Sequence, residues 1–275
     1  MGKFAGAVFG LSIFFAAAFG ILFETALLVL LFPFPRKWSR SLLGLLTSLW
    51  FELANLLLTH LLGLHIFVYG DPLPRHDDRE SALIISNHPT RVDWMLLWPF
   101  FGECGVLRDL RIVLKAPLRK IPAIGWHIQL ANFIFLERDL SKDREYIKRA
   151  CNLLSNEISH MERHPAVLIF PEGTDLSRSN IAKGHKFAEA KGLTKYNRVL
   201  HPRTTGMRIF FDECKHMGIE HVYDITVSYE ENPHGTRPSE ASIVGNTMPK
   251  SMHVHLKRYD VKVRASFTQQ STCSR

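Results

Sequence analysis

The sequence predicts an α/β protein, with a mixed, largely parallel sheet flanked by helices and preceded by an N-terminal membrane-embedded helical hairpin or two-helix anchor. Two long apolar stretches open the 275-residue chain, and short apolar runs alternate with helical patterns after them. We expect membrane-anchoring helices at 1–70, one α/β domain at 71–265 and a polar tail at 266–275.

The two apolar stretches differ in how well they suit a membrane. Residues 4–34 carry one acid, Glu24, and no base, and the stretch exceeds the roughly 20 residues that cross a bilayer. Residues 42–69 are a weaker candidate, because Glu52 and other polar groups interrupt them and such groups are costly in lipid. A cleaved signal peptide is the alternative for the first stretch, but its apolar run continues far past the alanines at 16–18.

A basic turn between the stretches predicts the topology. Arg36, Lys37 and Arg40 favour the cytosolic side. If the second stretch also crossed, the rest of the chain would be lumenal, so we expect it to dip into or lie on the cytosolic leaflet. The four cysteines form no CxxC pair and no Asn-x-Ser/Thr sequon occurs, which fits a reducing, cytosol-facing domain.

The glycines at 2, 6 and 10 would line one face of the first helix and could support a homodimer. Small-residue composition alone is the explanation that we favour. The net charge of +8 favours anionic partners. A basic cluster at 108–120, interleaved with apolar residues, would suit a membrane surface or the phosphates of coenzyme A, and a solvated helix face is the alternative. The apolar N-terminus and the lack of a nucleic-acid-binding motif argue against nucleic acid.

The α/β part shows its elements through their periodicity. Short apolar runs at 82–86, 132–136 and 166–170 predict buried strands, and apolar residues at helical spacing over 146–161 predict a helix between the last two. Because a helix joins these strands, parallel pairing is expected. Residues 222–229 and 252–259 predict further strands, joined by a loop rich in Pro, Gly, Ser and Asn.

A histidine and an aspartate follow the first of these strands at a spacing of five. Pro89 suits the first position of a helix, which would place His88 at the helix entrance and Asp93 one turn in. Asp93 could then hold one imidazole nitrogen and leave the other to take a proton from a hydroxyl. The chain has 14 histidines, so chance spacing is the alternative.

Two more strand ends carry polar groups. Phe-Pro-Glu-Gly-Thr at 170–174 forms a turn that would expose backbone N–H groups and Glu172 where ligands bind in α/β sheets. Arg138 follows the strand at 132–136 and offers a guanidinium to a phosphate. The alternative for Glu172 is an ordinary acid in the first turn of a helix. The alternative for Arg138 is a surface salt bridge with Glu137 or Asp139.

Together these motifs resemble a family. Their order resembles that found in the glycerophosphate and lysophospholipid acyltransferases, the 1-acylglycerol-3-phosphate acyltransferase-like family. That order is His-x4-Asp, an Arg after an apolar strand, Phe-Pro-Glu-Gly-Thr, and Leu-His-Pro at 200–202. The chain looks most like the lysocardiolipin acyltransferase branch, through Asn-His-x-Thr-Arg-x-Asp-Trp at 87–94, Phe-Pro-Glu-Gly-Thr-Asp-Leu at 170–176, Tyr-x-x-Val-Leu-His-Pro-Arg-Thr-Thr-Gly at 196–206 and Asp-Ile-Thr-Val at 224–227.

The resemblance implies a membrane-bound, acyl-CoA-dependent O-acyltransferase acting on lysocardiolipin, lysophosphatidylinositol or lysophosphatidate. It implies that His88 is the base and Asp93 its partner. The substrate-binding residues that it implies are Arg138, Glu172, Gly173, Thr174 and Pro202.

Acyl-CoA would be a co-substrate, with no cofactor and no metal. The expected partners are therefore membrane phospholipids, lysophospholipids and acyl-CoA. The expected location is the endoplasmic reticulum membrane, with the catalytic domain in the cytosol, or a mitochondria-associated membrane.

The chain departs from the family pattern at Asp175, where the wider family often has an arginine. We expect Arg178 or Lys183 to supply the missing positive charge. Two other functions remain open. A CoA-independent phospholipid transacylase would use the same His-Asp chemistry, and a non-catalytic membrane lipid-binding protein would make His88 dispensable.

Overall fold

The computed structural model describes residues 2–72, 80–161, 164–219, 221–230 and 237–260. Within these ranges the strands form one seven-stranded sheet in the order β1-β7-β6-β2-β5-β3-β4. Only β6 and β7 pair antiparallel, and every other pair is parallel, so the predicted mixed, largely parallel sheet is confirmed. The strands are β1 (His65–Gly70), β2 (Ala82–Ser86), β3 (Leu110–Lys115), β4 (Ile134–Leu136), β5 (Ala166–Ile169), β6 (His221–Tyr229) and β7 (Ser251–Asp260).

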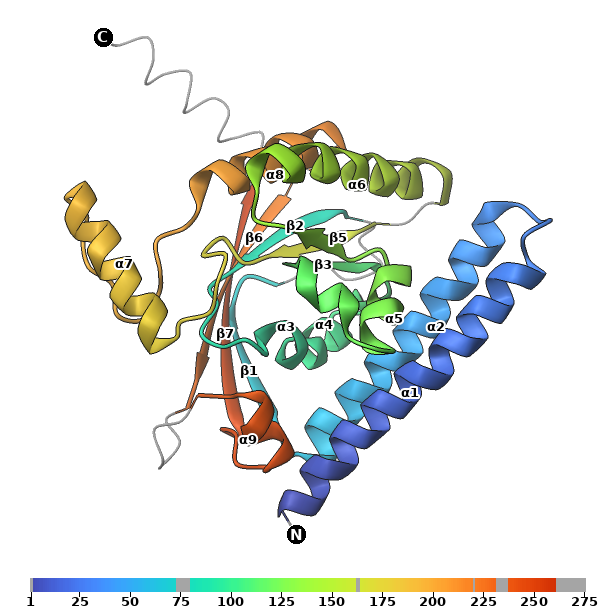
Figure 1. Cartoon of the computed structure of the whole chain (residues 1–275), viewed down its shortest axis with the longest axis horizontal. Coiled ribbons are helices and arrows are strands. Elements are labelled where there is room, and N and C mark those ends of the chain that lie inside the picture. The colour runs from blue at the N-terminus through green and yellow to red at the C-terminus, as the bar shows by residue number, and fades with distance from the viewer. Residues whose placement is uncertain (1, 73–79, 162–163, 220, 231–236, 261–275) are drawn as a thin grey trace.

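Helices cover both faces of the sheet (Figure 1). One face carries α6 (Leu140–Met161) and α8 (Thr204–His216), and the other carries the short helices α3 (Asp93–Leu96), α4 (Trp98–Glu103) and α5 (Ile124–Leu130). The central strands are buried on both sides: in β2, Ile84 joins the core under α3 to α5, whereas Leu83 joins the core under α6 and α8. Such continuous apolar runs are typical of parallel strands between two helical layers.

Two further helices lie at the edges of this arrangement. The helix α9 (Glu240–Val244) lies near the N-terminal end of α1, and α7 (Arg178–Lys191) projects from the side of the molecule (Figure 1). Ser177 caps the start of α7 by accepting from Asn180 N at 3.4 Å, and Gly192 ends it in the left-handed conformation.

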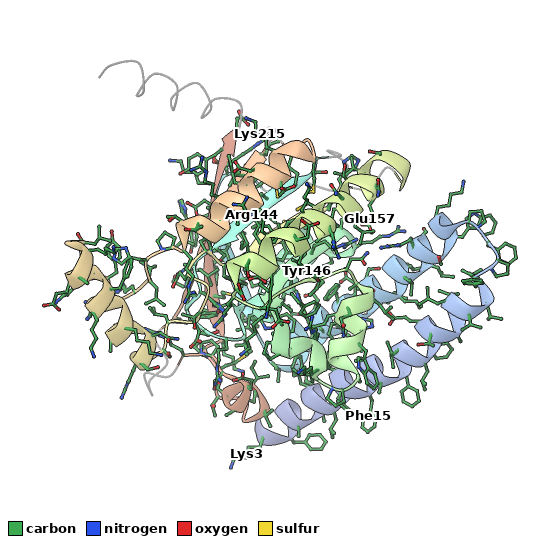
Figure 2. All side chains as sticks on the ribbon, turned by 45° about the horizontal axis from the view of Figure 1, so that its top comes forward. Lys3, Phe15, Arg144, Tyr146, Glu157 and Lys215 are labelled. Atoms are coloured by element: carbon green, nitrogen blue, oxygen red, sulfur yellow. The ribbon has the colours of Figure 1, made fainter. Side chains whose placement is uncertain are left out.

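The N-terminal hairpin packs along the flank of the domain. It consists of α1 (Gly2–Leu30) and α2 (Arg36–Leu56), which continues into a π-helical turn at Leu57–Leu61. Residues 3–30 and 37–61 are long and apolar enough to cross a membrane. The outer side is apolar as well: Phe15 is 52% exposed and points away from the domain (Figure 2). The inner side, with Phe9, Ile13, Trp50 and Phe51, shares the core of the sheet. These features indicate membrane association.

Buried polar contacts tie the hairpin to the domain. In α1, Glu24 is fully buried and lies 3.0 Å from Nδ1 of His127 in α5. In α2, Arg40 lies 3.0 Å from Glu157 of α6, and Arg111 of β3 approaches the other oxygen of Glu157 at 2.9 Å; Glu157 is labelled in Figure 2. The hairpin is therefore fixed to the domain at both α5 and α6.

The structure corrects three predictions made from the sequence. The basic cluster at 108–120 contains the strand β3 between two 3-10 turns rather than one helix face. It does not form one solvated patch, because Arg111 is buried against Glu157 and Arg119 pairs with Glu137 at 2.6 Å. The helix expected after Pro89 begins only at Asp93, because residues 89–92 form a bend and turn.

The third correction concerns the second apolar stretch, whose last residues form the edge strand β1 paired with β7. The division into parts at residue 70 stays a prediction, although the sheet begins with β1, and the polar tail lies outside the described residues.

Gly6 faces α9 within the chain: a Cβ at this glycine would lie 2.1 Å from the Val244 carbonyl oxygen. That contact occupies part of the small-residue face, and a homodimer through it stays a prediction.

Candidate active site

A pocket of about 820 Å³ lies at the carboxyl ends of the parallel strands, where ligands bind in α/β sheets. It is lined by residues that follow β2, β4 and β5 and by residues of α7 and α8. Six of the seven residues predicted from the sequence lie on its wall: His88, Arg138, Glu172, Gly173, Thr174 and Pro202. The seventh, Asp93, lies behind His88. The fold thus brings together residues that are up to 114 positions apart, from His88 to Pro202.

Asp93 is fully buried and fixes the orientation of His88. Its Oδ2 lies 3.0 Å from Nδ1 of His88 and also accepts the Thr90 N–H at 2.8 Å. Its Oδ1 accepts from the Thr90 hydroxyl at 2.8 Å and from the Tyr229 hydroxyl at 2.6 Å. Four hydrogen-bonding groups thus converge on one carboxylate and hold it in place. In the tautomer whose Nδ1 donates to this carboxylate, the acceptor nitrogen of neutral His88 is Nε2.

The imidazole of His88 is held on its flat side as well. Its ring stacks on Phe170 with centroids 4.3 Å apart and planes 24° apart. The side chain is 15% exposed, and it forms part of the pocket wall. Because Nδ1 is engaged by Asp93, Nε2 is the ring nitrogen available to a ligand in the pocket.

Asn87 locks the end of β2 to β6. Its Nδ2 donates to the Val227 carbonyl at 2.9 Å, and its Oδ1 accepts from the Val227 N–H at 2.7 Å. The side chain thus replaces one step of the backbone ladder, whose last pair is Ser86 and Ile225. This clamp sets the point at which the chain leaves the sheet and so positions His88.

Glu172 holds two segments of the site together. One carboxylate oxygen accepts the His88 N–H at 3.0 Å, and the other accepts the Leu200 N–H at 2.9 Å. Burial raises the pKa of Glu172, and the two backbone hydrogen bonds oppose that rise. Both oxygens are engaged and a carboxylate repels an anion. Glu172 therefore holds the His88 and Leu200 backbones in place, and its direct contact with the acceptor stays a prediction.

Gly173 and Thr174 shape the turn that follows Glu172. Gly173 has φ of +70°, which favours glycine, and its N–H donates to the Phe170 carbonyl at 3.0 Å. The Thr174 hydroxyl accepts from Asn180 Nδ2 at 2.9 Å. The N–H of Gly173 is therefore used within the turn, and Thr174 ties the turn to α7.

Arg138 follows β4 and is exposed toward the pocket. Its φ of +65° is uncommon for a residue with a side chain and is a local strain of a kind found at binding sites. Its pKa is lowered by partial burial and by the positive charge of Arg203, while the negative charge of Asp175 raises it. Among the described residues, Arg138 forms no salt bridge with its two acidic neighbours. Glu137 pairs with Arg119 at 2.6 Å, and Asp139 accepts from the Ser141 hydroxyl at 2.6 Å and lies 3.9 Å from Lys142.

Comparison with known proteins decides the family. Residues 65–230 match the family model described as Acyltransferase. The chain belongs to the acyltransferase family. It is 34% identical over 260 residues to lysocardiolipin acyltransferase 1 of Mus musculus, across 94% of this chain and 66% of the relative.

Two other similar proteins agree with the family assignment and the fold. The chain is 33% identical to lysophosphatidylinositol acyltransferase 10 of Caenorhabditis elegans, across 93% of this chain and 64% of that protein. The crystal structure of the 1-acyl-sn-glycerophosphate (LPA) acyltransferase PlsC of Thermotoga maritima superposes with a TM-score of 0.50 at 19% identity, across 95% of this chain and 88% of that one, which supports the fold. This acyltransferase chain spans about two thirds of the length of its curated relatives.

Sequence reasoning missed several residues of the candidate site. Tyr229 and Asn87 act through long-range contacts that no local pattern reveals. Thr90 lies inside the His-x4-Asp motif, and its position between the two residues could have indicated a contact with Asp93. Of the two cations expected to replace the missing arginine at 175, Lys183 lies on the pocket wall, whereas Arg178 is exposed and is not among the lining residues.

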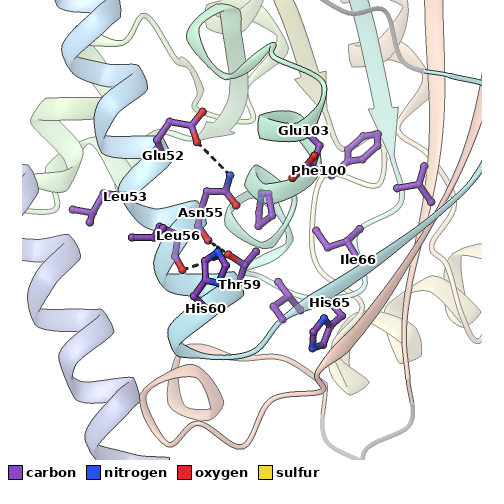
Figure 3. Close-up of a pocket in the computed structure, with 13 residues that line it drawn as sticks. Glu52, Leu53, Asn55, Leu56, Thr59, His60, His65, Ile66, Phe100 and Glu103 are labelled. Atoms are coloured by element: carbon purple, nitrogen blue, oxygen red, sulfur yellow. Dashed lines mark hydrogen bonds between the residues drawn. The ribbon is translucent and has the colours of Figure 1, made fainter.

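A second pocket, of about 870 Å³, lies between α2, β1 and α4 (Figure 3). Its polar residues include Glu52, Asn55, His60, His65 and Glu103. Asn55 Nδ2 donates to Glu52 at 3.3 Å. This pocket contains neither the buried His-Asp pair nor any of the motif residues, so the catalytic candidate in the acyltransferase is the first pocket.

Proposed function

We propose that this acyltransferase moves an acyl group from acyl-CoA to the free hydroxyl of an anionic lysophospholipid. The observation that carries the proposal is the His88–Asp93 pair at the wall of the pocket, with Nδ1 held at 3.0 Å by a buried carboxylate. A hydroxyl needs a base to attack a thioester, and a histidine oriented in this way is suited to be that base.

The reaction follows from this arrangement. Nε2 of His88 takes the hydroxyl proton as the oxygen of the lysophospholipid attacks the thioester carbonyl carbon. The imidazolium that forms is stabilised by Asp93. When the tetrahedral intermediate collapses, the carbon–sulfur bond breaks and His88 returns the proton to the leaving thiolate of coenzyme A. The new ester bond forms without an acyl-enzyme, so no protein nucleophile is needed.

The acceptor is proposed from charge and from the relatives. Arg138 offers a planar pair of donors to the phosphate that every candidate lysophospholipid carries. The relatives are named for lysocardiolipin and for lysophosphatidylinositol, and further relatives are named for 1-acyl-sn-glycerol-3-phosphate. All three are anionic, which fits the net charge of +8 of the chain. Beyond acyl-CoA and the acceptor, the proposed reaction needs no cofactor or metal.

The membrane arrangement is also a proposal: the hairpin lies in the cytosolic leaflet of the endoplasmic reticulum, and the pocket faces the cytosol. The contacts of Glu24 with His127 and of Arg40 with Glu157 support only the part of it that keeps the hairpin beside the domain, because they hold both helices against it. The cytosolic side is proposed from the basic turn at 36–40. Protease added to sealed microsomes should then digest the domain. Full protection until detergent is added would overturn this topology.

The purified full-length protein in detergent tests the function. It should be given a panel of lysophospholipids and acyl-CoAs, with free thiol and new diacyl product measured together. One thiol released for each product formed supports the proposal. Product that forms from a phospholipid donor without any thioester would instead identify a transacylase. Lipid binding without turnover, unchanged by His88→Ala, would identify a non-catalytic lipid-binding protein.

A further inference from the structure

Arg203 lies where the segment 200–202 returns to the pocket, just before α8. Its N–H donates to the Pro171 carbonyl at 2.8 Å, which fixes its backbone beside the turn at 170–174. Its side chain crosses that turn: a Cβ built on Gly173 would lie 2.9 Å from Cδ and 3.1 Å from Nε of Arg203. The absence of a side chain at Gly173 therefore gives Arg203 its path across the turn.

The charges around this turn are unbalanced. Arg138 and Arg203 both line the pocket, and partial burial together with the positive charge of Arg203 lowers the pKa of Arg138. Asp175 is the carboxylate that opposes this effect. Glu172 is already engaged by two backbone N–H groups, and Glu137 by Arg119. Arg138 and Arg203 therefore bring two positive charges to the same part of the pocket wall, and a bound anion would relieve their repulsion.

We propose that Arg203, acting with Arg138, binds the phosphate of the acceptor and supplies the cation that position 175 lacks in this chain. The proposal rests on the proposed function, because it takes the anion in this pocket to be the acceptor's phosphate. Two guanidiniums on different elements can grip separate oxygens of one phosphate group. Arg178 is exposed outside the pocket wall, and Lys183 offers only a point charge from the projecting helix α7.

Steady-state kinetics of Arg203→Ala and Arg203→Lys test the assignment, with lysophospholipid varied at saturating acyl-CoA and then the reverse. Loss of a charged hydrogen bond of this kind should raise the KM for lysophospholipid about 10- to 100-fold, with the KM for acyl-CoA changed less than about twofold. Arg203→Lys should recover only part of the loss, because an ammonium cannot reproduce the planar donors. Arg178→Ala is the matched control, since it removes one nearby exposed arginine outside the pocket.

Inorganic phosphate provides a probe that does not depend on turnover. It should compete with lysophospholipid and raise the melting temperature of the wild-type protein, and both effects should weaken in Arg203→Ala. Purely structural damage would lower both kcat and the melting temperature measured in the absence of phosphate. It would not selectively weaken the stabilisation that phosphate gives.

Several results would overturn the proposal: an unchanged KM for lysophospholipid, a rise confined to acyl-CoA, or a large rise for Lys183→Ala with none for Arg203→Ala. If the wild type shows no acyl transfer, the proposed function fails. Phosphate stabilisation that depends on Arg203 would still show in that case that the anion site exists.

Discussion

The Tyr229 hydroxyl, at the end of β6, donates to Oδ1 of Asp93 at 2.6 Å from 136 positions away in the sequence. Burial and the nearby charge of Asp93 raise the pKa of Tyr229 well above its usual value. The hydroxyl therefore remains a donor throughout the physiological pH range. It holds the carboxylate in the direction that Asp93 needs to orient His88, so Tyr229 is a positioning residue rather than a catalytic one.

Removal of this hydroxyl should lower the rate without loss of substrate binding. We expect Tyr229→Phe to lower kcat about tenfold, because a charged hydrogen bond is worth about 1.5–3 kcal/mol and the Thr90 hydroxyl still holds Oδ1. The KM values for both substrates should change less than about twofold. Steady-state kinetics check this, with Tyr69→Phe as a control on a tyrosine whose hydroxyl meets His253 instead. An unchanged kcat would show that the other donors suffice.

The second prediction concerns the base itself. His88→Ala should lower kcat by about 10²–10⁴-fold, the usual value of general-base catalysis, and should leave the protein folded. Asp93→Asn should be nearly as severe, because an amide at this position can present N–H to Nδ1 and favour the wrong tautomer. Circular dichroism and melting temperature control for folding, and His164→Ala controls for the loss of an unrelated histidine. Near-normal turnover in folded His88→Ala would remove His88 from the mechanism.

A third prediction follows from the two backbone hydrogen bonds of Glu172. In Glu172→Gln one acceptor is replaced by an NH2 group that faces a backbone N–H. We expect a loss of about 1–3 kcal/mol in the free energy of unfolding and a lower kcat, since the His88 backbone loosens. Thermal melting and kinetics on the same samples measure both. A variant with a raised KM for lysophospholipid and unchanged stability would instead indicate direct contact between Glu172 and the substrate.

The same residue predicts a sign for pH dependence. Because burial raises the pKa of Glu172, the folded protein holds this proton more tightly than the unfolded chain does. The contribution to stability is fully present below the unfolded pKa and is lost as pH rises through the folded pKa. The stability of the wild type relative to Glu172→Gln should therefore fall as pH rises through this range. A relative stability that increases with pH would contradict the raised pKa.

The fifth prediction concerns the attachment of α1. Glu24 and His127 are both buried, and removal of one member of such a pair typically costs about 3–5 kcal/mol. We expect Glu24→Ala to lower the melting temperature and to speed proteolysis within α1. The double variant Glu24→Leu with His127→Leu should recover most of the loss, since an apolar pair leaves no buried charge. The control is Phe15→Ala on the exposed side, which should behave like the wild type in detergent. Equal proteolysis of Glu24→Ala and the wild type would rule out the Glu24–His127 contact as an anchor.

Sequence reasoning predicted much of the fold and site, for reasons that particular residues illustrate. The strands β2, β5, β6 and β7 were predicted because their burial pattern is local and strong. The strand β3 was missed because its basic residues suggested a solvated face, whereas Arg111 is neutralised by Glu157, 46 positions away. The strand β1 was missed because an apolar segment at the end of a long apolar stretch gives no sign of where a helix ends and an edge strand begins.

The sequence by itself determined the candidate groups: a histidine and an aspartate after one buried strand, Phe-Pro-Glu-Gly-Thr after another, and an apolar hairpin before both. Local patterns carry such information because burial and backbone geometry act over a few residues. Only the tertiary structure decided which groups meet. It placed Tyr229 on Asp93, turned Glu172 toward two backbone N–H groups, and laid Arg203 across Gly173. Those contacts join segments 28 to 136 positions apart, and their partners are selected by the packing of the whole sheet rather than by any local spacing.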